Sequence, residues 1–233
     1  SPGSAGMCRW SSWNRSVGKD YVIRDGQLVG DFEGLYRDFE DPWMQSREDH
    51  VLDSRRQVAL NWCTRLRDLS PSGPQALRVL EIGCGFGHLT SALTDRGFAS
   101  IGVDVAYEAV CRARERHPES VFLRRSISDE GLLDDLDPDI LIMAEVTWYV
   151  LNELSEFLDS LRSFASERNR PTYLIHLLTT YGPGVQTYGR DYFTDQQGIL
   201  QFFDMNYLEY GQVHTPRSDD PASQGTYFVA ELN

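Results

Sequence analysis

The sequence predicts an α/β fold built around a mostly parallel sheet, and three stretches carry this prediction. The first, Val79–Leu89, is an apolar run that stops at three glycines spaced by single residues, after which helical periodicity begins. The second, Ala99–Val105, is an apolar run that ends in a carboxylate, and the third, Asp137–Leu151, contains a continuous run of strand-forming residues. Two strands joined by a tight turn and a helix within about 25 residues form a βαβ unit, and buried apolar runs are typical of parallel strands.

The composition suits one soluble α/β domain with a small addition. The chain has 233 residues, of which 41% are hydrophobic and 24% charged, enough to bury a single core. A net charge of −13 opposes binding to nucleic acid. No apolar run reaches the ~18 residues of a membrane span, so we expect a cytoplasmic protein without a membrane partner. The four scattered cysteines indicate reduced thiols, and their spacing predicts no metal site.

The N-terminal third is predicted to be a lead-in followed by a lid. Ser1–Gly6 is typical of a cloning remnant, and residues 1–30 show too little periodicity to predict an ordered element. Residues 31–76 are predicted to form a helical lid, with an amphipathic helix from about Ser46 to Leu69. Residues 77–233 then form the sheet domain.

The glycine turn and the acid at the end of the second strand suit a nucleoside. Gly83 and Gly85 allow a flat ligand to approach the main chain, and the helix that follows offers unpaired N–H groups. Asp104 can accept hydrogen bonds from both ribose hydroxyls, although it can also cap the next helix. Dinucleotide folds prefer the third glycine one residue after Gly87, so a nicotinamide oxidoreductase remains an alternative.

The form Glu81-x-Gly83-x-Gly85-x-Gly87 resembles the first motif of class I S-adenosylmethionine-dependent methyltransferases. The resemblance implies a Rossmann-like, mostly parallel seven-stranded sheet with helices on both faces and an antiparallel C-terminal strand pair, here 207–215 and 226–232. The Asp-Pro-Trp at 41–43, followed by Arg55 or Arg56, resembles small-molecule N-methyltransferases of the rhizobial nodulation type. In that family the Trp and an Arg lie near the methionine end of the cofactor.

The resemblance implies S-adenosyl-L-methionine as the cofactor and assigns residues to it. These follow the ends of successive strands or belong to the lid: Trp43, Arg55, Glu81, Gly83, Cys84, Gly85, Gly87, Asp104, Val105, Ser126, Ile127 and Glu145. The Asp that usually contacts adenine is replaced by Ser126, with Asp129 as the other candidate; either can instead cap the short helix 130–136.

Glu145, Tyr149 and His176 are the candidate catalytic residues. Glu145 ends the strand after Asp137, at the sheet edge where open α/β sheets bind ligands. We expect it to orient a protonated amine and pass the proton to water, with His176 as the rival base. The alternatives are that Glu145 holds the amino group of the cofactor, that Tyr149 plugs the sheet edge, and that His176 is a satisfied core residue. The aromatic, glycine-rich loop 181–193 is the expected acceptor-binding segment.

The sequence thus predicts methyl transfer to a small-molecule acceptor, with an amine favoured. The alternatives are an O-methyltransferase acting on a sugar, carboxylate or hydroxyl, a nicotinamide-dependent oxidoreductase, and a catalytically silent module that binds the cofactor. Neither a metal nor nucleic acid is expected as a partner, and the chain is expected to be a monomer or homodimer.

Overall fold

The computed structural model describes residues 19–46, 53–70, 77–182, 188–214 and 223–232. Their main strands are β3 (Arg78–Ile82), β4 (Ala99–Asp104), β5 (Val121–Arg124), β6 (Ile140–Ala144), β7 (Thr172–Thr180), β8 (Asn206–Val213) and β9 (Gln224–Leu232). Their longer helices are α3 (Phe32–Asp38), α5 (Ser54–Leu69), α6 (His88–Thr94), α7 (Tyr107–Arg116), α8 (Leu132–Leu136), α9 (Leu151–Ser166) and α10 (Gln196–Phe203).

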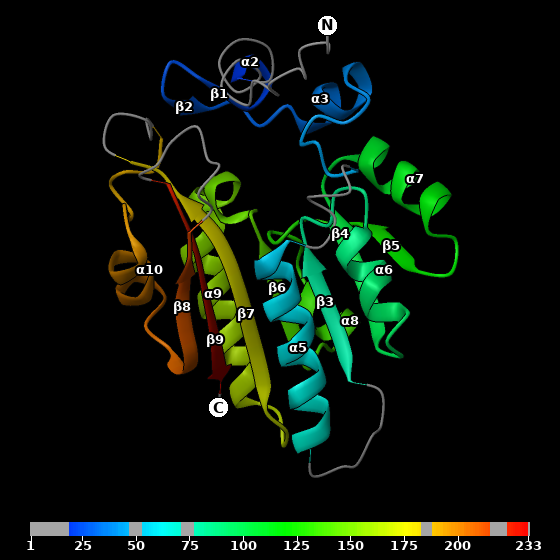
Figure 1. Ribbon diagram of the computed structural model, residues 1–233, viewed down its shortest axis with the longest axis vertical. Helices are drawn as coiled ribbons and strands as arrows, with labels where there is room; N and C mark the ends of the chain where they lie inside the picture. The colour runs from blue at the N-terminus through cyan, green and yellow to red at the C-terminus, as the bar shows by residue number, and fades with distance from the viewer. Residues whose placement is uncertain (1–18, 47–52, 71–76, 183–187, 215–222, 233) are drawn as a thin grey trace, which may run out of the picture.

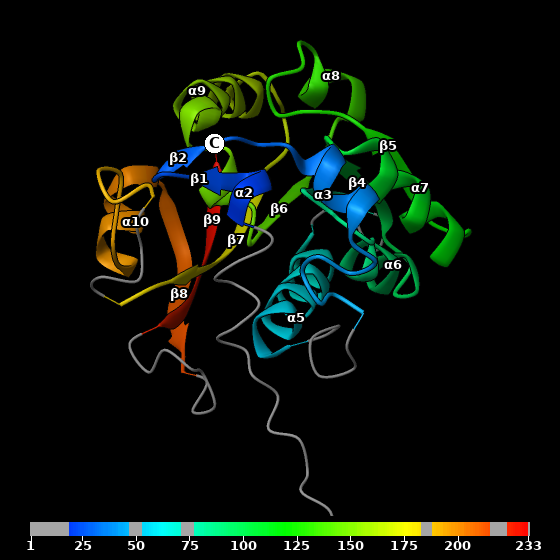
Figure 2. The ribbon, with the colours of Figure 1, turned by 90° about the horizontal axis from the view of Figure 1, so that it is seen from above.

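These strands form one seven-stranded sheet in the order β5-β4-β3-β6-β7-β9-β8 (Figure 1). Neighbours from β5 to β7 run parallel, whereas β9 pairs antiparallel with both β7 and β8. Helices cover both faces, with α5 and α6 on one and α8 and α9 on the other (Figure 2). The predicted Rossmann-like fold with an antiparallel C-terminal strand pair is confirmed.

Strand β6 shows why the central run is apolar without alternation. Ile140 and Ile142 belong to the core cluster that contains α5 and α6, while Leu141 and Met143 belong to the cluster on the opposite face. All four side chains are fully buried. A strand covered on both faces needs apolar residues at every position, which is what the sequence provides.

The predicted lid needs correction in its second half. Helix α5 begins at Ser54 rather than near Ser46, because Asp53 caps it by accepting the N–H groups of Arg55 and Arg56. Residues 47–52 lie outside the described part. Trp62 and its buried neighbours on α5 pack in the core against β3 and β6. Helix α5 is therefore a layer of the sheet domain rather than part of a separate helical unit.

Part of the predicted loose lead-in is ordered. Lys19–Val22 forms helix α2, and β1 (Ile23–Arg24) pairs with β2 (Gln27–Leu28) across a turn at Asp25 and Gly26. Both turn residues have positive φ angles, as a two-residue hairpin turn requires. With α3 they lie over the ends of the strands where the glycine turn is found (Figure 1). We call residues 19–46 the lid segment. Trp10 and Trp13 lie outside the described residues.

The C-terminal elements follow the prediction with small shifts in bounds. Helix α10 is capped by Asp195, whose side chain accepts the N–H of Gly198 at 2.8 Å. Most of the link between β8 and β9 lies outside the described residues.

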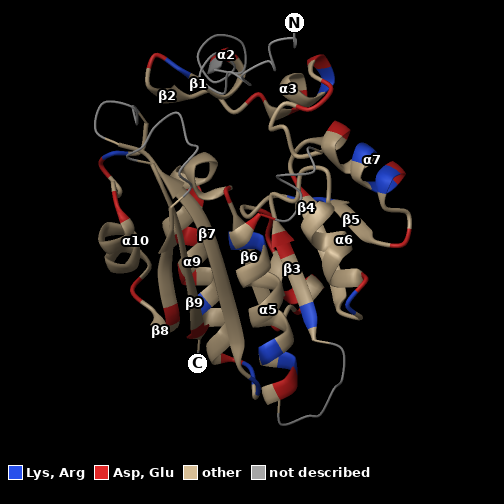
Figure 3. Ribbon diagram, viewed as in Figure 1, with Lys and Arg blue, Asp and Glu red and all other residues tan. Residues whose placement is uncertain are grey.

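Charged residues of both signs lie side by side on α7 (Figure 3). Arg112 pairs with Glu108 one helical turn earlier at 2.9 Å, and the pair is half-buried; ion pairs at this helical spacing contribute roughly 0.3–0.5 kcal/mol. Arg112 and Arg114 of this helix are thus paired with a nearby acid and with backbone carbonyls.

Replacing Gly87 by Ala is expected to lower the free energy of unfolding by about 2–4 kcal/mol. Gly87 has a φ of +78°, and a Cβ there would overlap the buried ring of Phe122. Gly97→Ala is the matched control, because Gly97 has a φ of +80° with open space around it; its cost is about 1 kcal/mol. Urea denaturation of both variants measures the difference. Equal losses would contradict the packing role of Gly87.

Candidate active site

The three glycines after β3 form the tight turn that the sequence predicts. Gly83, Gly85 and Gly87 have φ angles of +70°, +53° and +78°, a region that favours glycine. The N–H groups of Gly83 and Cys84 donate to the carbonyl of Val103 in β4, at 2.8 and 3.0 Å. These two bonds fix the turn to the neighbouring strand. Gly85 itself has no side chain that would cover its backbone.

Asp104 ends β4 beside this turn. Its carboxylate accepts the N–H of Gly85 at 2.9 Å and the N–H of Ala106 at 3.0 Å. Burial raises the pKa of Asp104, and these backbone donors act in the opposite direction. Each oxygen accepts one of the two bonds, which leaves lone pairs for further donors. Asp104 thus braces the start of α7 and still has the capacity that a pair of ribose hydroxyls requires.

The residues predicted for adenine follow β5, which lies next to β4 in the sheet. Ile127 is buried. The N–H of Ser126 donates to the carboxylate of Asp129 at 3.1 Å, and Arg125 pairs with the same carboxylate at 3.0 Å. Asp129 is therefore engaged in its own turn, while Val105, 43% exposed at the end of β4, offers an apolar surface on the same edge.

Glu145 directly follows β6 and has a φ of +60°, a strained conformation of the kind that collects at functional sites. Its side chain is 32% exposed. One oxygen pairs with the guanidinium of Arg55 and accepts the hydroxyl of Thr179 at 3.1 Å; the other accepts the backbone N–H of Thr179 at 2.9 Å. Arg55 and Glu145, predicted for different roles, therefore meet in one ion pair.

Arg55 and Arg56 point to different parts of the site. Arg56 lines a cavity of about 10 Å³ together with Gln45, Glu81, Cys84, His88 and Leu89. Burial raises the pKa of Glu81 to about 7, while a hydrogen bond from Thr90 opposes that rise. Of the two arginines that the sequence left open, Arg56 is the one near the glycine turn, and Arg55 is the one next to Glu145.

Aromatic rings from the lid segment cover the rim of the sheet. Tyr149 lies in a short 3₁₀ turn (η1, Thr147–Tyr149). Its ring centroid is 5.5 Å from that of Phe32 and 5.3 Å from that of Trp43. Burial raises the pKa of Tyr149, and the neighbouring Tyr181 and Glu145 add to the effect. Tyr149 is thus a neutral phenol in contact with the lid segment, and Trp43, predicted to contact the cofactor, lies against its ring.

His176 does not reach the site. It is fully buried in β7, and its ring stacks on Phe228 and packs against Phe203, with centroids 4.7 Å away in both cases. Its Nε2 hydrogen-bonds the hydroxyl of Thr147 at 2.7 Å. Burial lowers the pKa of His176 to about 3. The expectation that it serves as the rival base is wrong, because the inward side of β7 faces α9 and α10 rather than the rim.

The Asp-Pro-Trp motif builds the turn that brings the lid to the glycines. The carboxylate of Asp41 accepts the N–H of Gln45 at 2.7 Å and of Ser46 at 2.9 Å. This turn presents the side chain of Gln45, whose carbonyl oxygen accepts the N–H of Phe86 at 3.2 Å. A Cβ at Gly85 would overlap that amide. Gln45 therefore covers the bare main chain of the glycine turn.

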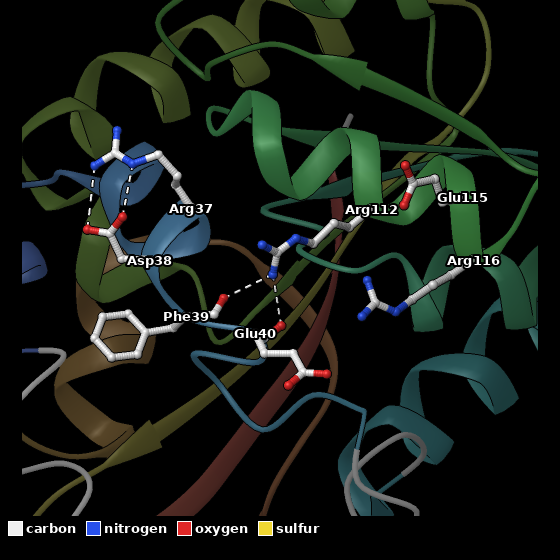
Figure 4. Close-up of a pocket in the computed structure, with 7 residues that line it drawn as sticks. All are labelled: Arg37, Asp38, Phe39, Glu40, Arg112, Glu115 and Arg116. Atoms are coloured by element: carbon white, nitrogen blue, oxygen red, sulfur yellow. Dashed lines mark hydrogen bonds and ion pairs between the residues drawn. The ribbon is translucent and has the colours of Figure 1, made fainter.

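The lid segment is also fastened to α7. The carboxylate of Glu33 accepts the N–H of Tyr107 at 2.6 Å, at the start of α7. The guanidinium of Arg112 donates to the carbonyls of Phe39 and Glu40, both at 2.9 Å, at the end of α3 (Figure 4). Each helix terminus thus receives the charge that its dipole favours. An open groove of about 590 Å³ lies between the two segments, lined by Arg37, Asp38, Phe39, Glu40, Arg112, Glu115 and Arg116.

Two residues of this site were missed in the sequence. Gln45 stands two positions after Trp43, but a glutamine in a polar stretch gives no signal of its own. Thr179 is the last but one residue of β7, and its position at the carboxyl edge of an apolar strand was the available clue. Of the predicted acceptor loop, the described part packs on the rim, where the rings of Phe193 and Trp148 lie 5.0 Å apart.

Two other kinds of feature are absent from the part of the chain that the structure describes. In residues 19–46, 53–70, 77–182, 188–214 and 223–232, no group of three or more His, Cys, Asp or Glu is arranged to hold a metal ion. Within the same ranges, no helix has both the length and the apolar character needed to cross a membrane.

Comparison with solved structures shows the same fold. Magnesium protoporphyrin IX methyltransferase from Synechocystis PCC 6803, solved with S-adenosylmethionine, has a TM-score of 0.56 at 17% identity, over 95% of this chain and 94% of that one. The N-methyltransferase NodS from Bradyrhizobium japonicum, solved with S-adenosylhomocysteine, has a TM-score of 0.56 at 19% identity, over 85% of this chain and 97% of that one.

Sequence comparison identifies the family. The ubiquinone biosynthesis O-methyltransferase of Glaesserella parasuis is 31% identical over 137 residues, and this match covers 55% of each protein, so the chain spans about half the length of that curated relative. The model of the methyltransferase domain family matches residues 54–209, from the first residue of α5 into β8. The chain therefore belongs to the methyltransferase domain family and shares the fold of solved S-adenosylmethionine-dependent methyltransferases.

Proposed function

We propose that this protein transfers a methyl group from S-adenosylmethionine to the nitrogen of a small-molecule amine. The observation that supports an amine is Glu145, a partly exposed carboxylate at the carboxyl end of β6 beside the ring of Tyr149. Carboxylates and aromatic faces both attract a cation, and an alkylamine is protonated near neutral pH. The solved N-methyltransferase NodS, which shares the fold, is consistent with this choice.

The described residues fit the cofactor. The glycine turn has no side chains of its own and is covered only by the Gln45 amide of the lid segment, and Asp104 lies beside it with lone pairs to spare. Arg56, next to the turn, supplies a cation suited to the methionine carboxylate, a role in which it replaces Arg55. When bound, S-adenosylmethionine supplies an electrophilic methyl group on a sulfonium that is its own leaving group.

In this proposal the protein chiefly positions the acceptor and manages one proton. Glu145 orients the ammonium group and passes its proton to water, after which the lone pair is free to attack. Phe32 and Trp43 of the lid segment cover Tyr149 and limit access of solvent from that side. Tyr149, a neutral phenol, contributes its ring face rather than a base.

A second candidate is O-methylation, and Arg55 is the observation that favours it. The guanidinium neutralises Glu145, which weakens the attraction for an ammonium and suits a hydroxyl or carboxylate oxygen. The curated relative from Glaesserella parasuis is named an O-methyltransferase, which supports the same reading.

The charge and the cysteines support a small acceptor in a reducing compartment. The net charge of −13 disfavours a nucleic-acid acceptor. Cys63 and Cys84 are buried free thiols, and Cys111 is also free. We accordingly place the reaction in the cytoplasm, in a monomer or homodimer.

The proposal is tested by incubating the protein with S-adenosylmethionine and matched acceptor pairs, such as benzylamine with benzyl alcohol and glucosamine with glucose. Mass spectrometry of each mixture measures the gain of one methyl group. Methylation of the amines at a higher rate than the alcohols supports N-methylation. Faster methylation of benzyl alcohol and glucose than of the matching amines would contradict N-methylation and support O-methylation.

Addition of S-adenosylhomocysteine is expected to slow proteolytic cleavage within residues 30–50 severalfold. The lid segment contacts the glycine turn through Gln45 and the rim through Trp43, so a ligand held between them stabilises the covered state. Cleavage rates with and without the ligand are followed by mass spectrometry, with Asp104→Ala protein as the control that should lose the effect. Equal cleavage rates with and without the ligand would contradict the proposal that the lid segment covers the bound cofactor.

A further inference from the structure

Thr179 contacts three different parts of the site at the carboxyl end of β7. Its backbone N–H donates to one oxygen of Glu145 at 2.9 Å, and its hydroxyl donates to the other at 3.1 Å. The same hydroxyl accepts a bond from the guanidinium of Arg55 at 3.0 Å. Its carbonyl accepts the indole N–H of Trp148 at 2.8 Å. One residue therefore joins β6, α5 and the 3₁₀ turn at the rim.

The sheet is built to accommodate this junction. Thr179 lies opposite Gly225 in the β7–β9 pairing, and a Cβ at Gly225 would come within 2.8 Å of Cδ of Arg55. The glycine thus leaves room for the arginine to reach across the strand end. On the other side, the N–H of Glu145 donates to the carbonyl of Leu177 at 2.8 Å, which fixes the strained backbone of Glu145 against β7.

Holding both oxygens of a carboxylate removes the rotational freedom that an exposed glutamate otherwise keeps. A hydroxyl that bridges the carboxylate and the guanidinium also sets the angle between the two charges. The side of Glu145 that remains exposed is then presented in one orientation. Catalysis by alignment depends on such fixed geometry.

We propose that Thr179 is a positioning residue for methyl transfer, which acts by fixing the Glu145 carboxylate toward the acceptor. This inference rests on the proposed function, in which Glu145 contacts the acceptor. It predicts that the hydroxyl of Thr179, rather than its volume, determines the rate.

The test compares Thr179→Val, which keeps the shape and removes the hydroxyl, with Thr179→Ser, which keeps the hydroxyl. Thr180→Val is the matched control, because the neighbouring Thr180 donates its hydroxyl to the carbonyl of Gln224, away from Glu145. With benzylamine as the acceptor, Thr179→Val is expected to lower kcat about tenfold. Thr179→Ser and Thr180→Val should stay within twofold of wild type, and KM for the cofactor should not change.

A double-mutant cycle separates this inference from the proposed function. If Thr179 acts through Glu145, the tenfold loss disappears when Thr179→Val is made in a Glu145→Gln background. Persistence of the loss there, or no loss in the single variant, would overturn the role of Thr179 while leaving Glu145 in place. A Glu145→Gln variant with full activity would instead contradict the proposed function, in which Glu145 contacts the acceptor.

A spectroscopic measurement needs no acceptor and no activity. The carboxylate stretching band of Glu145 is isolated as the infrared difference between wild type and Glu145→Gln. It is expected to shift in Thr179→Val and to stay unchanged in Thr180→Val, because only the first variant removes a donor from that carboxylate. An unshifted band in a Thr179→Val protein that melts cooperatively would overturn the inference.

Discussion

Asp104→Ala is expected to weaken binding of S-adenosylhomocysteine by on the order of 2–4 kcal/mol, because two charge-assisted hydrogen bonds to the ribose are lost. The structure adds a second contribution, since Asp104 also holds the N–H groups of Gly85 and Ala106. Its removal leaves both donors unpaired at the turn that the ligand must approach. Isothermal titration calorimetry measures the loss directly.

The control for this variant is Asp95→Ala. Asp95 is an exposed residue at the end of α6, and its replacement removes the same charge without touching the turn. It should bind the ligand as tightly as wild type. Denaturation curves for both variants ensure that only folded protein is compared. An Asp104→Ala protein that binds with wild-type affinity would refute the ribose assignment.

Glu145→Gln is expected to lower the rate of methyl transfer by about a hundredfold, with little change in cofactor affinity. The amide keeps the shape but removes the charge that orients an ammonium, and it leaves Arg55 with Asp53, 3.6 Å away, as its ion-pair partner. Transfer to benzylamine is measured at saturating S-adenosylmethionine across pH, with calorimetry of S-adenosylhomocysteine as the binding readout.

His176→Asn supplies the comparison. His176 packs between two phenyl rings in the core, so its replacement should lower the melting temperature while the folded fraction keeps its transfer rate within about threefold. If Glu145→Gln leaves transfer intact, or His176→Asn abolishes transfer in folded protein, the assignment of roles at the rim fails.

The fold was predictable because its strongest signals are local. The glycines at 83, 85 and 87 define their own turn, and the unbroken apolar run at 140–144 requires burial on both faces wherever it sits. The placement of Asp104 and Glu145 at one edge of the sheet was predictable for the same reason, since the first ends β4 and the second directly follows β6.

The features that the sequence did not predict are contacts between residues that lie far apart in the chain. Nothing near Arg55 indicates that it pairs with a carboxylate 90 positions later. His176 and Thr179 lie on the same strand, and only packing against α10 and α5 shows that the first faces the core and the second the site. The start of α5 was misplaced because Val51 continued the apolar period, whereas Asp53 supplied the cap.

The burial of His176 also governs how the protein withstands acid. Its imidazole is neutral in the folded state, with a pKa of about 3, and an unfolded chain binds the proton near the ordinary histidine pKa of 6.5. As pH falls through this window the unfolded state takes up this proton first, so the imidazole alone lowers the free energy of unfolding by up to about 1.4 kcal/mol per pH unit, whereas Glu81, whose pKa burial raises to about 7, acts in the opposite direction. The decline begins near pH 6.5 and continues toward pH 3. Loss of methyl transfer in mild acid would therefore report the melting of the core as much as any titration at the rim.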